Sequence, residues 1–205
     1  MNKKLEERMT NQCKKLRDDL MFIIPSFTEI ERMTIVSIGT PKVNYDAVGP
    51  LVGSYLKILI DENEELKDFV DIVGTVDDPA NALTVVDKTN YLFESEYLDN
   101  FILAIDASVT SEESILFTPH VRNEGVKPGR GLGRKIREIG EASLVCPTLL
   151  IDKDASTLNM LEDRWLYCSS YTDVIYLAKN ITEILFDVLK EKLNMYFKDI
   201  EEELK

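Results

Sequence analysis

A strand, a loop and the start of a helix follow one another in Ile35-Val-Ser-Ile-Gly-Thr-Pro-Lys-Val-Asn-Tyr-Asp46-Ala-Val-Gly-Pro-Leu51. The apolar run from Thr34 to Gly39 predicts a buried strand, because it is short and ends in glycine. A strand that leads through a loop into a helix is typical of α/β sheets, which bind ligands at the carboxyl edge of their strands. We therefore expect Asp46 at this edge, outside the helix proper.

A second apolar strand also ends in a carboxylate. The sequence Phe101-Ile-Leu-Ala-Ile-Asp106-Ala predicts a strand from Asn100 to Ala107 that is buried on both faces. Parallel strands of one sheet end at the same edge, so Asp46 and Asp106 are expected to meet there. These two acids are the candidate catalytic residues.

Strands and helices alternate along the rest of the chain. Further elements are predicted as helices over residues 3–20, from Gly49-Pro50 to Leu59, from Asp78-Pro79 and from Thr172, and as strands over 69–74, 115–118 and 144–151. The first helix either packs on the domain, as we expect, or pairs with a partner. Pro147 indicates a sheet edge or a bulge in the last predicted strand.

This alternation predicts a single α/β domain over residues 1–205, a three-layer sandwich with a mostly parallel central sheet. An N-terminal helix (1–22) and a C-terminal helix (172–205) flank a core (32–152) that carries the motifs.

Composition narrows the classes of partner. The net charge of −13 argues against nucleic acid and disfavours anionic membranes, because both need clustered basic residues. The three scattered cysteines fit reduced thiols in the cytoplasm better than disulfides or a zinc site. The amino terminus carries no apolar segment typical of a secretory signal, and no apolar run approaches the roughly 20 residues that span a bilayer. A peptide or protein is the expected partner.

Four motifs follow one another over roughly residues 32–150. They are Ser37-Ile-Gly-Thr, Asp46-Ala-Val-Gly-Pro-Leu-Val-Gly, Ala104-Ile-Asp-Ala and Lys127-Pro-Gly-Arg-Gly-Leu-Gly-Arg-Lys. In this order the chain resembles the sporulation-protein family typified by YyaC. It is also similar to the germination protease and, more distantly, to the hydrogenase maturation endopeptidases.

The resemblance implies a phosphorylase/hydrolase-like, hydrogenase maturation peptidase-like fold and a link to sporulation in a Gram-positive bacterium. In the germination protease the aspartates that match Asp46 and Asp106 are held to be catalytic, and in the hydrogenase peptidases the matching acids bind metal with a histidine. The chain departs from the protease pattern at Lys127, where that pattern has histidine. The resemblance implies no particular reaction for the YyaC-type members.

An aspartate pair has a specific chemistry. Two like acids within hydrogen-bonding reach cannot both ionise easily, so one keeps a proton while the other activates water, as in aspartic peptidases. The structural alternative is that Asp46 satisfies backbone donors at the helix start and Asp106 ends its strand.

His120 is the only histidine. It is expected to be a solvated loop residue, and no cofactor is expected. In the alternative reading it completes a nickel or zinc site with Asp46 and Asp106, because imidazole and carboxylates suit these metals.

The basic, glycine-rich loop is the candidate substrate-binding element. Lys127, Gly129, Arg130 and Gly131 could bind an acidic group through positive charges and free amides. The alternative is that the glycines allow a tight turn of the chain and that the basic residues form ion pairs with the acidic residues that are in excess.

Three hypotheses follow for the whole chain. The first is a sporulation-associated peptidase that uses the aspartate pair. The second is a non-catalytic sporulation factor that binds a protein partner through the same cleft or the C-terminal helix, and the third is a metal-dependent maturation endopeptidase.

Overall fold

The computed structural model describes residues 3–94, 99–129, 133, 136–153 and 165–204. Its centre is a six-stranded sheet in the order β2-β1-β3-β5-β4, with β6 also paired to β5. The strands are β1 (Arg32–Ser37), β2 (Val70–Val73), β3 (Asn100–Thr110), β4 (His120–Arg122), β5 (Ala142–Ile151) and β6 (Trp165–Cys168). The first three and β5 run parallel, whereas β4 and β6 pair antiparallel with the two halves of β5.

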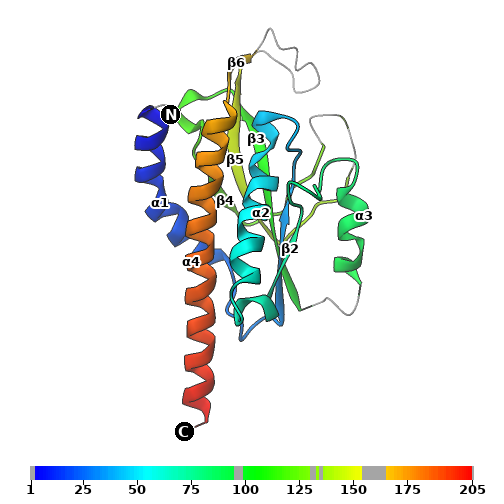
Figure 1. Cartoon of the computed structure of the whole chain (residues 1–205), viewed down its shortest axis with the longest axis vertical. Helices are drawn as coiled ribbons and strands as arrows, with labels where there is room; N and C mark the ends of the chain where they lie inside the picture. The colour runs from blue at the N-terminus through cyan, green and yellow to red at the C-terminus, as the bar shows by residue number, and fades with distance from the viewer. Residues whose placement is uncertain (1–2, 95–98, 130–132, 134–135, 154–164, 205) are drawn as a thin grey trace.

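Helices cover both faces of this sheet (Figure 1). The long helices α1 (Lys3–Ile23), α2 (Val48–Asp61) and α4 (Tyr171–Glu203) lie on one face, where α4 contacts both of the others. The short helix α3 (Val85–Thr89) and the turn Asn90–Phe93 lie on the other face. The predicted three-layer sandwich with a mostly parallel sheet is therefore confirmed.

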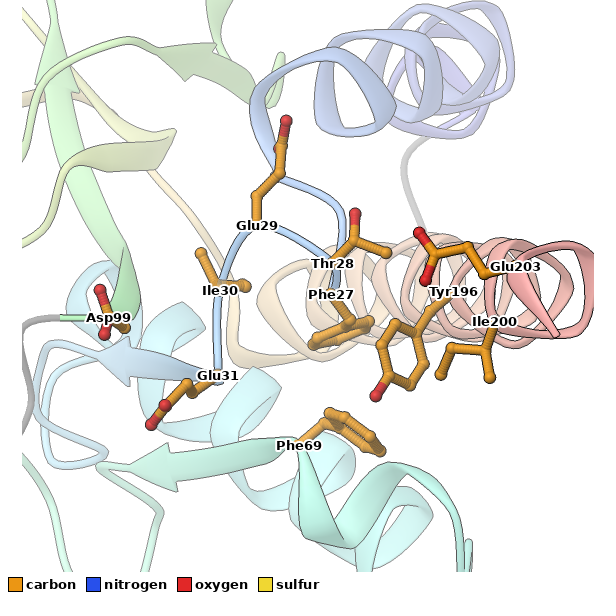
Figure 2. A pocket seen from close by; sticks show the side chains of 10 residues that line it. All are labelled: Phe27, Thr28, Glu29, Ile30, Glu31, Phe69, Asp99, Tyr196, Ile200 and Glu203. Carbon is orange, nitrogen blue, oxygen red and sulfur yellow. The ribbon is translucent and has the colours of Figure 1, made fainter.

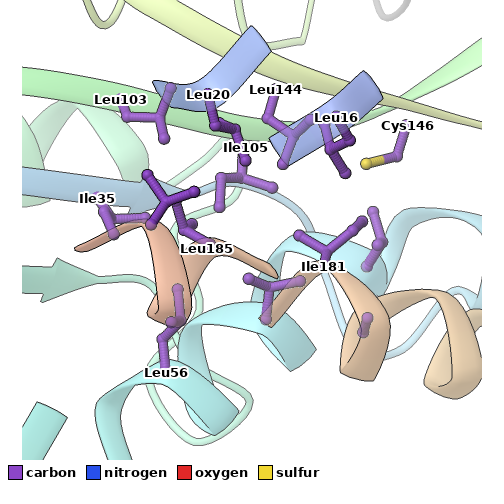
Figure 3. Packing of buried hydrophobic residues seen from close by; sticks show 14 of the residues in the cluster. Leu16, Leu20, Ile35, Leu56, Leu103, Ile105, Leu144, Cys146, Ile181 and Leu185 are labelled. Atoms are coloured by element: carbon purple, nitrogen blue, oxygen red, sulfur yellow. The ribbon is translucent and has the colours of Figure 1, made fainter. Parts of the chain in front are cut away.

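The larger core lies between the sheet and the three long helices. Apolar residues at helical spacing in α1 and α4 meet the alternating side chains of β3 and β5 there. Figure 3 shows Leu16 and Leu20 of α1, Leu103 and Ile105 of β3, and Ile181 and Leu185 of α4 in this layer. The buried leucines of α1 confirm that this helix packs on the domain.

Several predicted boundaries were wrong. The segment 115–118 is not a strand: Glu113–Ile115 form a 3-10 turn, and Phe117 has a φ of 60°. The helix predicted from Asp78 begins at Val85. Helix α2 begins at Val48 with Ala47 as its N-cap, so Gly49 and Pro50 lie inside the first turn, where the missing amide of proline is tolerated.

Pro147 marks a bulge inside the sheet. Ser108 pairs with Pro147 and Val109 pairs with Leu149, so Thr148 is the extra residue on β5. The bulge alternative is thus confirmed. The edge alternative is wrong, because β5 has β3 on one side and β4 and β6 on the other.

None of the described helices is long and apolar enough to cross a membrane.

Candidate active site

The sheet changes direction between β1 and β3. The chain leaves β1 through α2 and enters β2 on one side, whereas β3 lies on the other side of β1. Doubly wound sheets hold ligands at such a switch point, outside the carboxyl ends of the strands. Ser37 at the end of β1 pairs with Ile105, so Asp106 is the first residue beyond that pair.

Asp46 reaches the same edge from the loop after β1. It ends the 3-10 turn Asn44–Asp46, which lies against β3 and β5. The Thr40 amide donates a hydrogen bond to the Asp46 carboxylate at 2.9 Å and approaches the Asp46 carbonyl oxygen at 3.1 Å. The loop therefore folds back on the end of its own strand.

Gly39 makes this close approach possible. Its φ is 139°, which favours glycine, and a Cβ at this position would lie 2.1 Å from the carbonyl oxygen of Asp46. Any larger residue would push the Asp46 turn away from the sheet.

The β5 bulge holds the loop from the other side. The hydroxyl of Thr148 donates to the carbonyl oxygen of Tyr45 at 2.5 Å, and the hydroxyl of Ser169 donates to the carbonyl of Thr148. The Tyr45 ring packs edge-on to Trp165, with 5.3 Å between ring centroids. Sequence reasoning missed Thr148, although Pro147 signalled the bulge that presents it.

The two carboxyl groups are protonated at different pH values. Burial raises the pKa of Asp46 to about 6, against an opposing hydrogen bond from Thr40. Burial raises the pKa of Asp106 well above its usual range, and the negative charge of Asp46 raises it further, while the Ala107 amide opposes the shift. Because Asp46 ionises first, it does so beside a neutral Asp106.

This order of ionisation leaves one carboxylate next to one carboxylic acid over the intermediate pH range. Both residues are of intermediate burial, between the core and the surface. The arrangement can therefore accept a proton at Asp46 and donate one at Asp106, which are the two roles of general acid-base catalysis.

The structural alternative for Asp46 holds only in part. Its carboxylate accepts a backbone amide, as that alternative requires, but the amide belongs to Thr40 in the loop. The N-cap of α2 is Ala47, and no side chain caps this helix. The side chain of Asp46 thus does not cap helix α2, as expected.

His120 lies across a strand from the aspartates. It pairs with Val145 of β5, and Val145 pairs with Asp106 on its other side. Two strand spacings, about 10 Å, thus separate the backbones of His120 and Asp106. Within the described ranges, no group of three or more histidine, cysteine, aspartate or glutamate residues is placed to hold a metal ion. The described residues do not fit the three-ligand nickel or zinc site.

The basic loop leaves from the sheet face opposite the long helices. Val126 and Ile139 close its base with two backbone hydrogen bonds of 3.0 and 2.9 Å, and both belong with Ala104 to the smaller core cluster. Side chains alternate along β3, so Asp106 points to the same face as Ala104.

Only part of the predicted loop site can be placed. Arg130 and Gly131 lie outside the described residues. Gly129 is partly exposed with a φ of 68°, and Lys127 forms an ion pair with Glu138 at 3.3 Å. For Lys127 the structure therefore agrees with the alternative in which the basic residues pair with acids.

The thiol of Cys146 is inert beside this site. Cys146 is fully buried, and its pKa is raised by burial and by the charge of Asp106. A thiol that stays protonated is a poor nucleophile, so Cys146 is not a candidate reactive group.

Comparisons with known proteins agree with the resemblance read from the motifs. The chain is 30% identical over 109 residues to the uncharacterised protein YyaC of Bacillus subtilis, a match that covers 53% of this chain and 49% of YyaC. It is 26% identical over 126 residues to the germination protease of Bacillus cytotoxicus, which covers 57% of this chain and 34% of the protease. The chain thus spans half or less of each curated relative.

The hydrogenase maturation protease HycI from Thermococcus kodakarensis is similar in structure, with 17% identity and a TM-score of 0.45 over 81% of this chain and 97% of HycI.

A family model described as "Protein of unknown function (DUF1256)" matches residues 4–184. The chain belongs to this DUF1256 family.

Proposed function

We propose that this protein is a sporulation-associated hydrolase of peptide bonds in which Asp46 and Asp106 act together on a water molecule. One observation supports the proposal: Asp46 follows β1, Asp106 lies on β3 beside the switch point between these strands, and the charge of Asp46 raises the pKa of Asp106. The similarity to a germination protease supports the substrate class, and it supports the link to sporulation.

In the proposed first step, ionised Asp46 takes a proton from water as the water oxygen attacks the scissile carbonyl carbon. Protonated Asp106 gives its proton to the carbonyl oxygen at the same time. The product is a neutral tetrahedral diol, which leaves Asp46 protonated and Asp106 ionised.

In the second step, Asp46 returns its proton to the amide nitrogen while the carbon–nitrogen bond breaks. Asp106 takes a proton from one hydroxyl of the diol, which becomes the new carboxylic acid. The amine leaves, and both aspartates regain their starting protonation states, so one water is consumed for each bond cleaved.

The glycine-rich loop is proposed to hold the substrate. Its amides at Gly129 and Gly131 would bind the peptide backbone, and Lys127 and Arg130 would bind acidic side chains. Lys127 must then exchange its ion pair with Glu138 for the substrate.

The test compares Asp106→Asn with Asp77→Asn. Asp77 is exposed and forms no ion pair in the described part of the chain, so its replacement removes one charge without breaking an ion pair. Purified variants are assayed on a library of quenched fluorescent peptides, with thermal unfolding as the check on folding. Asp106→Asn should abolish cleavage, and Asp77→Asn should retain it.

The same two variants separate the alternatives in sporulating cells. A folded Asp106→Asn protein that fully supports sporulation would favour the non-catalytic partner-binding function. In the peptide assay, cleavage by the wild-type protein that appears only after nickel or zinc is added would favour the metal-dependent peptidase.

A further inference from the structure

A pocket lies at the opposite edge of the sheet from the aspartate pair. This pocket has a volume of about 650 Å³ and is bordered by residues just before the strands: Glu31 precedes β1, Phe69 precedes β2 and Asp99 precedes β3. The C-terminal part of α4 forms its remaining wall, with Tyr196 and Glu203 (Figure 2). Its volume lies in the range typical of ligand sites.

Aromatic rings form the centre of the pocket. The ring centroids of Phe27 and Phe69 are 5.1 Å apart, and those of Phe69 and Tyr196 are 5.4 Å apart. Phe27 is buried, whereas Phe69 and Tyr196 are partly exposed. Because the faces of aromatic rings carry partial negative charge, such a cluster attracts cations as well as apolar groups.

Carboxylates surround these rings. Glu29, Glu31, Asp99 and Glu203 line the pocket, and none of the lysines or arginines that the structure describes does so. In the described part of the chain no ion pair involves any of the four, although Glu29 accepts a hydrogen bond from the Ser26 amide at 3.2 Å. In Figure 2 the carboxylates of Glu31 and Asp99 lie on one side of the rings and that of Glu203 on the other.

One buried cation lies near this pocket. Lys192 is one turn before Tyr196 on α4, and burial lowers its pKa while the charge of Glu29 raises it. Glu29 is thus partly neutralised from inside the protein. Glu31, Asp99 and Glu203 carry the charge that remains available to a ligand.

We propose that this pocket docks a basic segment of a partner protein through arginine or lysine side chains. An aromatic centre between carboxylates complements a guanidinium or ammonium group with its apolar stem. Acids on two sides of the rings fit a segment with more than one basic side chain better than a single small cation. The site does not depend on the aspartate pair.

The experiment uses the full chain and a fluorescein-labelled peptide of alternating arginine and serine, followed by fluorescence anisotropy. A peptide with citrulline in place of arginine keeps the shape and loses the charge. The test variant is Glu31→Gln with Glu203→Gln. The control is Asp77→Asn with Asp87→Asn, which removes two exposed acids on the α3 side and lowers the net negative charge equally.

The arginine peptide should bind the wild type and the control with affinities within about twofold of each other, and the test variant about tenfold more weakly. Tyr196→Leu should also weaken binding, because it removes one ring of the cluster. Asp106→Asn should leave binding unchanged, which separates this site from the proposed catalytic one.

Three results would overturn the proposal. Equal weakening in the test and control variants would show only a general attraction to an acidic protein. Equal binding of the citrulline peptide would exclude recognition of charge. Binding of free spermidine with full displacement of the peptide would indicate a small-molecule site instead of a docking site.

Discussion

The hydroxyl of Thr148 donates a hydrogen bond to the backbone carbonyl of Tyr45 at 2.5 Å, which ties the bulge of β5 to the residue before Asp46. The two residues are far apart in sequence, and only the register shift beside Pro147 brings them together. The position of Asp46 relative to Asp106 therefore depends on three strands at once.

Replacement of Thr148 by valine keeps the volume of the side chain and removes its donor. We expect the free energy of unfolding to fall by about 1–3 kcal/mol, because the Tyr45 carbonyl loses its buried partner. Urea denaturation measures this loss, and peptide cleavage should fall as well. Thr148→Ser keeps the hydroxyl, so it is the matched control for the hydrogen bond to the Tyr45 carbonyl. If the valine variant matched the wild type in both assays, Thr148 would have no role in positioning.

The two aspartates should respond differently to removal of each other. Asp46→Asn removes the charge that raises the pKa of Asp106, so that pKa should fall. Asp106→Asn should leave the pKa of Asp46 near about 6, because Asp106 is already neutral when Asp46 ionises. Carbon-detected NMR titration of the side-chain carboxyl carbons measures both values. Two equal shifts would contradict the order of ionisation.

Stability should depend on pH through the same pair. The pKa of Asp46 rises from 3.8 to about 6 on folding, so the folded state holds more protons than the unfolded state between these values. The free energy of unfolding should therefore fall as pH rises from about 4 to about 6, by about 3 kcal/mol for Asp46.

Asp46→Asn isolates this contribution. The variant should be more stable than the wild type at pH 7.5 and equal to it near pH 3.5, because both side chains are then neutral. Asparagine can still accept the Thr40 amide, so the loop should keep its fold. Chemical denaturation across this pH range measures the difference, with Asp77→Asn as the control that should show no such trend. A variant less stable than the wild type at pH 7.5 would mean that the Asp46 charge stabilises the fold.

The central sheet could be predicted because its strands are buried on both faces. The runs that include Ile35 and Ile105 are apolar throughout, and a turn signal follows the first, which is enough to locate such strands. Their carboxyl ends had to share an edge once the sheet was parallel. The expectation that Asp46 and Asp106 lie near that edge followed from these two facts, although β3 continues to Thr110, beyond Asp106.

The other features of the fold and of the two sites depend on contacts between residues that are far apart in sequence. A local sequence pattern does not contain such contacts. The apolar run at 115–118 has the composition of a strand, but the Phe117 amide donates to the Pro147 carbonyl and the chain turns there. Thr148 reaches Tyr45 only because of the register between β3 and β5. The aromatic pocket combines Phe27 and Phe69 with Tyr196, from three separate parts of the chain.

Cleavage, under the proposed function, should follow the ionisation of the pair. The active form has Asp46 ionised and Asp106 protonated, so kcat/KM should rise through pH about 6 and fall again at higher pH as Asp106 loses its proton. The acid limb therefore reports Asp46 and the alkaline limb reports Asp106. Asp106→Glu keeps the acid and lengthens its side chain, so any residual activity should keep a bell-shaped profile with a displaced alkaline limb. Asp77→Asn should leave both limbs in place. A wild-type profile that stays flat from pH 5 to pH 7 would show that cleavage does not depend on the ionisation of Asp46, whose pKa is about 6.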